Sequence, residues 1–465
     1  METSNVNMTT PICDFVGQYQ ESDTVRFHMP GHKGMSHLGM EALDITEIKG
    51  ADALYEADGI IAESEANVSR IFGTAKTVYS TEGSSQCVKA MIHLVAGLGK
   101  GDKSVILAAR NVHKAFVYGA ALADCEVEWL YGANNKSICE CVISAREVED
   151  KLLGMKEENR LPVAVYITSP DYLGNIQDIK ALADVCHSYG VLLMVDNAHG
   201  AYMHFVGDGC HPIDLGADIC CDSAHKTLPV LTGGAYLHIS RDAIERDYLV
   251  ENVKNVMAIY GSTSPSYLIL QSLDMCNKYL VSGYESKLEE CIKKLDALRS
   301  KLDKYVVKTD DLLKITLRIP GVSGQKLADI LRSLGGECEF ADKDYIVLMF
   351  TPDSDMSKLE LVYDAVAKAE ETLKNGMASN EANTIFDETM AVEALNNHTS
   401  AMSIRKAVFS NHEIINVSEV VGRVCAAPTV SCPPAIPVVI SGEIITEADV
   451  KIFMDYGIDK VDVVK

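Results

Sequence analysis

Short runs of apolar residues, many of them β-branched, alternate with stretches of helical periodicity between about residues 66 and 240. The clearest runs are SVILAA at 104–109, VAVYITS at 163–169, VLLMVD at 191–196 and GAYLHIS at 234–240. Continuous apolar strands separated by helical segments are typical of a mainly parallel sheet that helices cover on both faces. The pattern therefore predicts an α/β fold, and such sheets bind ligands at the carboxyl ends of their strands.

The pattern changes after residue 240. Residues from about 243 to 306 have the periodicity of long helices, and the segments that follow, through YIVLMFTP at 345–352, predict a smaller α+β unit. We expect a domain boundary near 295–310. The polar stretch at 375–400 predicts a linker that leads into a last small unit.

Composition narrows the class of protein. The chain has 465 residues, 47% of them hydrophobic, and a formal net charge of −24, which argues against a nucleic-acid partner because phosphate backbones are bound through excess Lys and Arg. The first residues contain no basic segment followed by an apolar one, and no run approaches the roughly 18 apolar residues of a membrane span. We expect a cytoplasmic protein without a membrane partner.

The 14 cysteines are scattered without CxxC spacing, which indicates buried free thiols in a reducing compartment and predicts no metal site. The acidic surface could attract a cationic substrate, although a solvated acidic surface is the simpler interpretation.

Lys226 is the central candidate for chemistry. It lies in Ser223-Ala224-His225-Lys226-Thr227, which follows the apolar run ADICC. A lysine just beyond a buried strand is poorly explained as surface charge. The position suits a desolvated amine that attacks a carbonyl, as Schiff-base lysines do.

Asp196 ends the apolar run VLLMVD and is followed by Asn197-Ala198-His199-Gly200. A carboxylate at the end of a rigid strand can keep a pyridine nitrogen protonated, and pyridoxal phosphate (PLP) sites combine such a partner with a lysine. The alternative is an aspartate that caps a helix or belongs to a loop.

Gly83-Ser84-Ser85 precedes the helical segment QCVKAMIHLVAGL. Small residues at a helix N-terminus offer free backbone N–H groups, hydroxyl donors and the positive end of the helix dipole to a phosphate. Alone, this motif equally predicts a helix cap. Together with Asp196 and Lys226 it predicts a PLP site. The cofactor needs donors for its phosphate, a carboxylate for its ring nitrogen and an amine for its aldehyde.

Two further segments are candidates. His113, in ARNVHKAF after a predicted strand, could stack on a planar ring and donate a proton, or could be a structural histidine. The hydroxyl-rich segment 261–265, which contains Thr263, could contact a phosphate or could begin a helix with Pro265 at its first position.

At these residues the chain resembles the PLP-dependent ornithine/lysine/arginine decarboxylases of the aspartate aminotransferase fold (fold type I), in the short form without an N-terminal wing domain. The resemblance runs nearly end to end and rests on MPGHKG at 29–34 and SAHKTLP at 223–229, which are specific to this family. Supporting segments are DITEIKGADAL at 44–54, STEGSSQ at 80–86, ARNVHKAF at 109–116, VDNAHGAY at 195–202, GSTSPSY at 261–267, ECEFAD at 337–342 and PPAIPVVISGE at 433–443.

The resemblance implies roles for individual residues. Lys226 would carry PLP as a Schiff base, Asp196 would pair with the pyridine nitrogen, and His113 would stack on the ring. The other residues implied to surround the cofactor are Gly83, Ser84, Ser85, His199, Ser223 and His225, with Ser262 or Thr263 from a partner subunit.

The resemblance also implies the organisation of the chain. We expect an N-terminal arm (1–48), a large PLP-binding domain (49–300), a small α+β domain (301–375), and a linker with a C-terminal subdomain (376–465). The family's active site lies across a dimer interface, which implies a homodimer or an assembly of dimers. Asn197, Gly233 and the segment SCPPAIP depart from the family pattern, and these departures bear on substrate choice rather than on PLP binding.

The implied reaction is decarboxylation of arginine, lysine or ornithine to agmatine, cadaverine or putrescine. Lys226 or His225 would return a proton to the α-carbon. The basic side chain of the substrate needs an acidic counterpart, for which Glu339 and Asp342 are candidates and Asp44 and Glu47 weaker ones. The alternative is that these carboxylates are simply exposed.

Two other functions compete with this one. An aminotransferase or another lyase of the same fold would keep the cofactor, and Arg318 could then bind the α-carboxylate. A PLP-binding regulator would need a DNA-binding helix-turn-helix or a basic segment, and the sequence has neither.

Overall fold

The computed structural model describes residues 8–99, 101, 103–133, 135–207, 209–374, 398–428 and 434–465. The chain divides into two compact units. The first consists of Met1–Leu107, Ala145–Ser169 and Asp178–Ser286, and the second of Ala108–Ser144, Pro170–Gln177 and Lys287–Lys465.

A seven-stranded sheet is the central feature of the fold, with the strand order β1-β7-β6-β5-β4-β2-β3. Strand β5 is parallel to both β4 and β6, whereas β7 runs antiparallel to both β6 and β1. The bounds are β1 (Lys76–Ser80), β2 (Val105–Ala109), β3 (Glu126–Leu130), β4 (Ala164–Thr168), β5 (Leu192–Asp196), β6 (Ile219–Asp222) and β7 (Ala235–Ile239). The strands predicted at 104–109, 163–169, 191–196 and 234–240 are confirmed.

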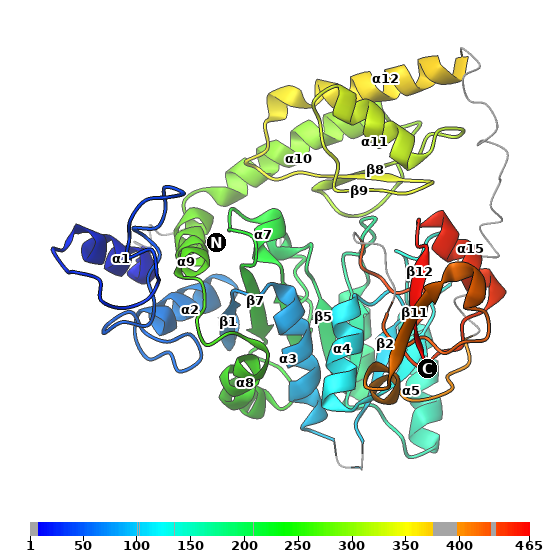
Figure 1. Cartoon of the computed structure of the whole chain (residues 1–465), viewed down its shortest axis with the longest axis horizontal. Helices are drawn as coiled ribbons and strands as arrows, with labels where there is room; N and C mark the ends of the chain where they lie inside the picture. The colour runs from blue at the N-terminus through cyan, green and yellow to red at the C-terminus, as the bar shows by residue number, and fades with distance from the viewer. Residues whose placement is uncertain are drawn as a thin grey trace. The chain divides into compact units, whose positions relative to one another are not determined.

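Helices of the first unit explain why its strands are apolar throughout. Helix α3 packs against β1, β6 and β7, and α2 packs against β1 (Figure 1). Strands covered in this way bury every side chain, as β5 and β7 do. The helices described in this unit are α1 (Pro11–Glu21), α2 (Ile60–Ile71), α3 (Ser84–Ala96), α5 (Ala145–Glu157), α6 (Ile179–Ser188), η1 (Ala201–Phe205), α7 (Ala224–Thr227), α8 (Arg246–Tyr260) and α9 (Tyr267–Val281).

The register of the strands assigns side chains to the two faces of the sheet. Residues paired across neighbouring strands share a face, and residues two apart in one strand share it as well. Tyr166 pairs with Met194, and Asp196 pairs with Cys221, so one face carries Tyr166, Asp196 and Cys221. Cys220 pairs with His238, so the opposite face carries His238 and Asp222.

The second unit contains the predicted small α+β unit. Its antiparallel sheet has the order β8-β10-β9, with β8 (Lys314–Leu317), β9 (Phe340–Ala341) and β10 (Ile346–Met349), and a further antiparallel pair joins β11 (His412–Asn416) to β12 (Lys460–Val464). Helices described here are α4 (Lys114–Ala123), α11 (Gly324–Ser333), η2 (Met356–Lys358), α12 (Glu360–Lys374), α14 (Ile404–Val408), η3 (Val417–Glu419) and α15 (Glu447–Asp455).

The helical stretch predicted from about residue 243 to 306 is interrupted after Val281. Helix α9 ends at Val281, and α10 (Tyr284–Lys301) begins after Ser282-Gly283. Gly283 has φ 86°, a left-handed conformation that favours glycine and ends helices.

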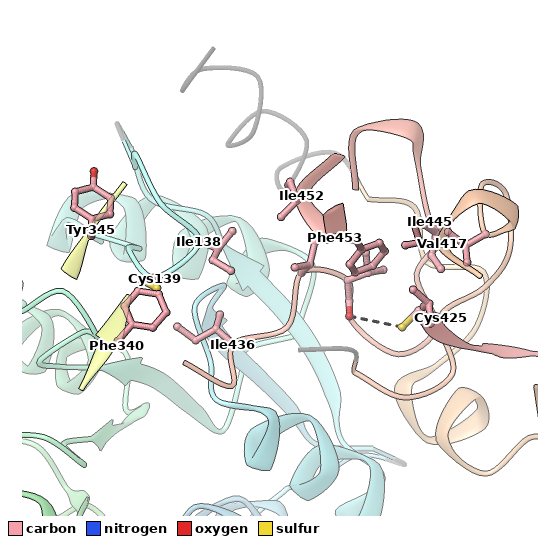
Figure 2. Close-up of a cluster of buried hydrophobic side chains, with 14 of the residues drawn as sticks. Ile138, Cys139, Phe340, Tyr345, Val417, Cys425, Ile436, Ile445, Ile452 and Phe453 are labelled. Atoms are coloured by element: carbon pink, nitrogen blue, oxygen red, sulfur yellow. Dashed lines mark hydrogen bonds between the residues drawn. The ribbon is translucent and has the colours of Figure 1, made fainter. Parts of the chain in front are cut away.

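Segments distant in sequence share one hydrophobic core in the second unit. Ile138 and Cys139 pack in the same cluster as Phe340 and Tyr345, and this cluster continues to Phe453 (Figure 2). The dashed line in Figure 2 marks a hydrogen bond in which the thiol of Cys425 donates to the carbonyl oxygen of Val439 at 3.7 Å.

A buried ion pair adds a polar connection within this unit. Arg110 and Glu443 lie 3.3 Å apart, with side chains that are 5% and 3% exposed. Arg110 also donates to the carbonyl oxygens of Pro437 and Val438. Residues 108–144 therefore belong to the same compact unit as the C-terminal part of the chain.

The predicted domain boundaries stay a proposal. Most of the predicted linker, residues 375–397, lies outside the described residues. Within the described ranges, no helix has the length and apolar character that crossing a lipid bilayer requires.

Candidate functional site

The ends of strands β5 and β6 bring the main candidate residues together in the first unit. Strand β5 ends at Asp196 and β6 ends at Asp222, and Ser223 then begins the short helix α7 that carries His225 and Lys226. Because Asp196 pairs with Cys221 across the parallel ladder, the two strands end at the same edge. The predicted positions of Asp196 and Lys226 at strand ends are confirmed.

Lys226 contacts His199. The Nζ atom of Lys226 lies 2.8 Å from Nε2 of His199, which follows β5 three residues after Asp196 and is 6% exposed. Lys226 itself is half-buried. An amine in this position is partly shielded from water and has an imidazole beside it that can exchange a proton with it.

Ser84 connects the N-terminus of α3 to the segment that carries Lys226. The hydroxyl of Ser223 donates to Oγ of Ser84 at 2.7 Å. Gly83 precedes the helix with φ 69°, and Ser84 and Ser85 form the first turn of a 13-residue helix. The N–H groups of this turn have no partners within the helix and suit an anion.

Asp196 is held by three donors. Its Oδ2 accepts from the hydroxyl of Tyr166 at 2.9 Å, and its Oδ1 accepts from the backbone N–H of Ala198 at 3.2 Å and from the thiol of Cys221 at 3.6 Å. Burial raises the pKa values of Tyr166 and Cys221 well above their usual ranges, so both keep their protons. The sequence analysis did not identify Tyr166 or Cys221.

A second buried carboxylate, Asp222, lies on the opposite face of the sheet. It accepts from Nδ2 of Asn197 at 2.7 Å, from Nε2 of His211 at 3.0 Å and from Nε2 of His238 at 3.1 Å. Burial by itself raises the pKa of Asp222, but the two imidazoles outweigh that effect and hold the pKa far below its usual range. Burial lowers the pKa of His238, which favours its neutral form.

The tautomer of His211 decides what this network can bind. His211, Cys220 and Asp222 are close enough to suggest a metal cluster. However, the backbone N–H of Ile213 donates to Nδ1 of His211 at 3.3 Å, so the imidazole proton is on Nε2 and points to Asp222. A protonated Nε2 has no lone pair for a metal ion, and the cluster is therefore a hydrogen-bond network.

Two other predicted residues of the first unit are His225, which lies on α7, and Thr263. Nδ1 of His225 is 2.9 Å from the carbonyl oxygen of Gly234. Thr263 is exposed between α8 and α9. The N-cap of α9 is Ser266, so the helix begins at Tyr267, two residues after the position that Pro265 suggested.

His113, Glu339 and Asp342 belong to the second unit. His113 caps α4, with Nδ1 accepting from the N–H of Ala115. Glu339 accepts from the hydroxyl of Tyr172 at 2.7 Å. Asp342 accepts from the backbone N–H groups of two following residues, and burial raises its pKa to about 6. The functional roles of these three residues stay predictions.

Solved structures share the fold of this chain. The lysine decarboxylase LdcF of Francisella novicida superposes with a TM-score of 0.78 at 17% identity, over 99% of this chain and 82% of that one. Oryza sativa TDC, in a crystal structure with PLP, superposes with a TM-score of 0.56 at 12% identity, over 69% of this chain and 75% of that one. The predicted fold class, an α/β fold of type I, is confirmed.

Sequence comparison defines the family. Residues 10–320 match the family model of the Orn/Lys/Arg decarboxylase major domain, and residues 380–456 match that of the Orn/Lys/Arg decarboxylase C-terminal domain. The chain therefore belongs to the Orn/Lys/Arg decarboxylase family. The arginine decarboxylase of Bacillus subtilis (strain 168) is 27% identical over 470 aligned residues, which cover 95% of this chain and 92% of that protein. The predicted family is confirmed.

Proposed function

We propose that this chain binds PLP on Lys226 and decarboxylates a basic L-amino acid. The observation that carries the proposal is the convergence of Lys226, Asp196 and the N-terminus of α3 in the first unit. Hydrogen bonds from Lys226 to His199 and from Ser223 to Ser84 connect these elements.

The three groups of PLP each find a matching residue. An aldehyde needs a shielded amine, which Lys226 offers. A protonated pyridine nitrogen needs a buried carboxylate, which Asp196 offers at 3% exposure. A phosphate needs several hydrogen-bond donors, which Ser84, Ser85 and the first turn of α3 offer. The donor set thus fits this cofactor.

The chemistry divides between the cofactor and the chain. When bound, PLP supplies an electron-accepting ring that takes up the electron pair left by the departing carboxylate. Asp196 would be the negative partner of that ring's pyridine nitrogen. Nε2 of His199 accepts a proton from Nζ of Lys226, which leaves the amine neutral and nucleophilic. Lys226 and His225 are the candidates for returning a proton to the substrate carbon.

L-Arginine is the first substrate to test. The Bacillus subtilis protein, which aligns over nearly the whole chain, is named an arginine decarboxylase, whereas the family description also covers ornithine and lysine. Glu339 and Asp342 are the proposed acidic counterparts of the substrate's basic side chain. The proposal also includes a cytoplasmic homodimer and the roles that the family resemblance implies for Thr263 and His113.

The test is an assay of the purified chain with PLP against L-arginine, L-lysine and L-ornithine, with release of carbon dioxide and amine as the readout. Turnover of at least one substrate supports the proposal. Bound PLP without decarboxylation of any of the three would contradict it and favour transamination or another lyase reaction.

His199→Gln is expected to slow the attachment of PLP to Lys226 by about 10²-fold at neutral pH, because the amine loses the base that removes its proton. The rate should recover as the pH approaches the ordinary lysine value of about 10.4, where the amine loses its proton to water. Stopped-flow absorbance after mixing cofactor-free protein with PLP measures this rate.

The control is His37→Gln, since His37 is an exposed imidazole in the N-terminal segment. Equal attachment rates for both variants at neutral pH would exclude His199 as the proton acceptor.

A further inference from the structure

We propose that Tyr166 and Cys221 are positioning residues that hold the carboxylate of Asp196 in place for the pyridine nitrogen of the cofactor. This inference rests on the proposed function and deepens it. Neither residue needs to contact the cofactor, because both act through Asp196.

The register of the sheet places the three side chains together. Tyr166 on β4 pairs with Met194, and Cys221 on β6 pairs with Asp196, so all three polar side chains share one face. Tyr166 and Cys221 are both 0% exposed, and Asp196 is 3% exposed. Water therefore has almost no access to this cluster, and its donors must come from the protein.

Counting lone pairs shows what the arrangement leaves for a ligand. An ionised carboxylate has about four acceptor positions. The hydroxyl of Tyr166 uses one on Oδ2, and the thiol of Cys221 and the N–H of Ala198 use two on Oδ1. Asp196 thus keeps about one position for a further donor, which matches the single N–H of a protonated pyridine.

The two side chains also satisfy the buried carboxylate of Asp196 with hydrogen bonds. A buried carboxylate without hydrogen bonds is driven towards its neutral form, which cannot balance a positive ring. Burial raises the pKa values of Tyr166 and Cys221, so at neutral pH both remain protonated and can only donate to Asp196. The pair thereby fixes the orientation of the carboxylate.

The two donors differ in strength. The hydroxyl of Tyr166 lies 2.9 Å from its acceptor, whereas the thiol of Cys221 lies 3.6 Å away and is a weak donor. Loss of the Tyr166 hydroxyl should therefore have the larger effect on cofactor binding.

The experiment compares Tyr166→Phe with Tyr236→Phe in the full chain. Tyr236 is a matched control because its buried side chain lies on β7, on the opposite face from Asp196. The readouts are the Kd for PLP and the ¹⁵N chemical shift of bound PLP labelled at the pyridine nitrogen. We expect Tyr166→Phe to raise the Kd roughly tenfold and to move the ¹⁵N shift towards the unprotonated value, with Tyr236→Phe unchanged.

A second pair of variants covers the case in which Tyr166→Phe does not fold. Cys221→Ala should raise the Kd about two- to threefold, because a thiol is a weak donor, whereas Cys220→Ala should not, because Cys220 contacts Asp222 instead. Wild-type chain that binds no PLP would overturn the proposed function and this role with it. Wild-type binding combined with indistinguishable ¹⁵N shifts in all four variants would overturn the positioning role alone.

Discussion

Lys226→Ala protein is expected to lose decarboxylation by about 10³-fold or more and to lose the absorbance band of covalently held PLP. The substitution removes the amine that attaches the cofactor, and it leaves His199 facing a methyl group instead of Nζ. Steady-state release of carbon dioxide and an absorbance spectrum of the purified protein measure both effects.

Lys180→Ala serves as the control for this prediction. Lys180 is an exposed lysine on α6 that pairs with Asp184 at the surface, and its loss should leave activity and spectrum unchanged. Activity of the Lys226→Ala protein within about tenfold of wild type would show that Lys226 does not carry the reaction.

Asp222→Ala is expected to lower the free energy of unfolding by about 3 kcal/mol or more at pH 7. The substitution removes the acceptor shared by buried donors on Asn197, His211 and His238 and by the weak thiol donor of Cys220. Each unsatisfied N–H group costs about 1–3 kcal/mol. Urea denaturation followed by circular dichroism, without added PLP, gives the two unfolding free energies.

The effect of Asp222 should depend on pH. Its pKa is lowered in the folded state, so its contribution is fully present above the unfolded value of about 3.9 and decreases as the pH falls below that. The difference between wild type and Asp222→Ala should therefore narrow below about pH 4. Asp184 is exposed and pairs with Lys180 at the surface. The substitution Asp184→Ala should therefore change the free energy of unfolding by less than about 1 kcal/mol. A similarly small change for Asp222→Ala would contradict the role assigned to this network.

The sequence was sufficient to locate four strands of the seven-stranded sheet and several residues that follow strands. Apolar runs are a local signal, so β2, β4, β5 and β7 could be predicted from them directly. Strand ends then indicated Asp196 and Lys226, and a glycine followed by serines before a helix indicated Ser84. The break between α9 and α10 also had a local signal, the Ser282-Gly283 pair within a helical stretch.

The partners of these residues could not be predicted because they depend on pairing between distant strands. Tyr166 reaches Asp196 only through the register of β4 against β5, and Cys221 only through that of β5 against β6. The same reason applies to the second unit, where Cys139 and Phe453 share a core although they lie far apart in the chain.

Asp196 and Asn197 are consecutive residues that point to opposite sides of the sheet, and this has a consequence for how the strand is aligned. Strand β5 is buried on both sides, so its apolar residues alone would tolerate a shift by one position. Such a shift would bring the side-chain amide of Asn197 to Tyr166. It would also bury the carboxylate of Asp196 beside that of Asp222, and the two negative charges would repel each other. The polar contacts of Asp196 and Asn197 at the end of β5 therefore fix the register of this strand. The register that places Asp196 beside Tyr166 is also the one that keeps its carboxylate away from that of Asp222.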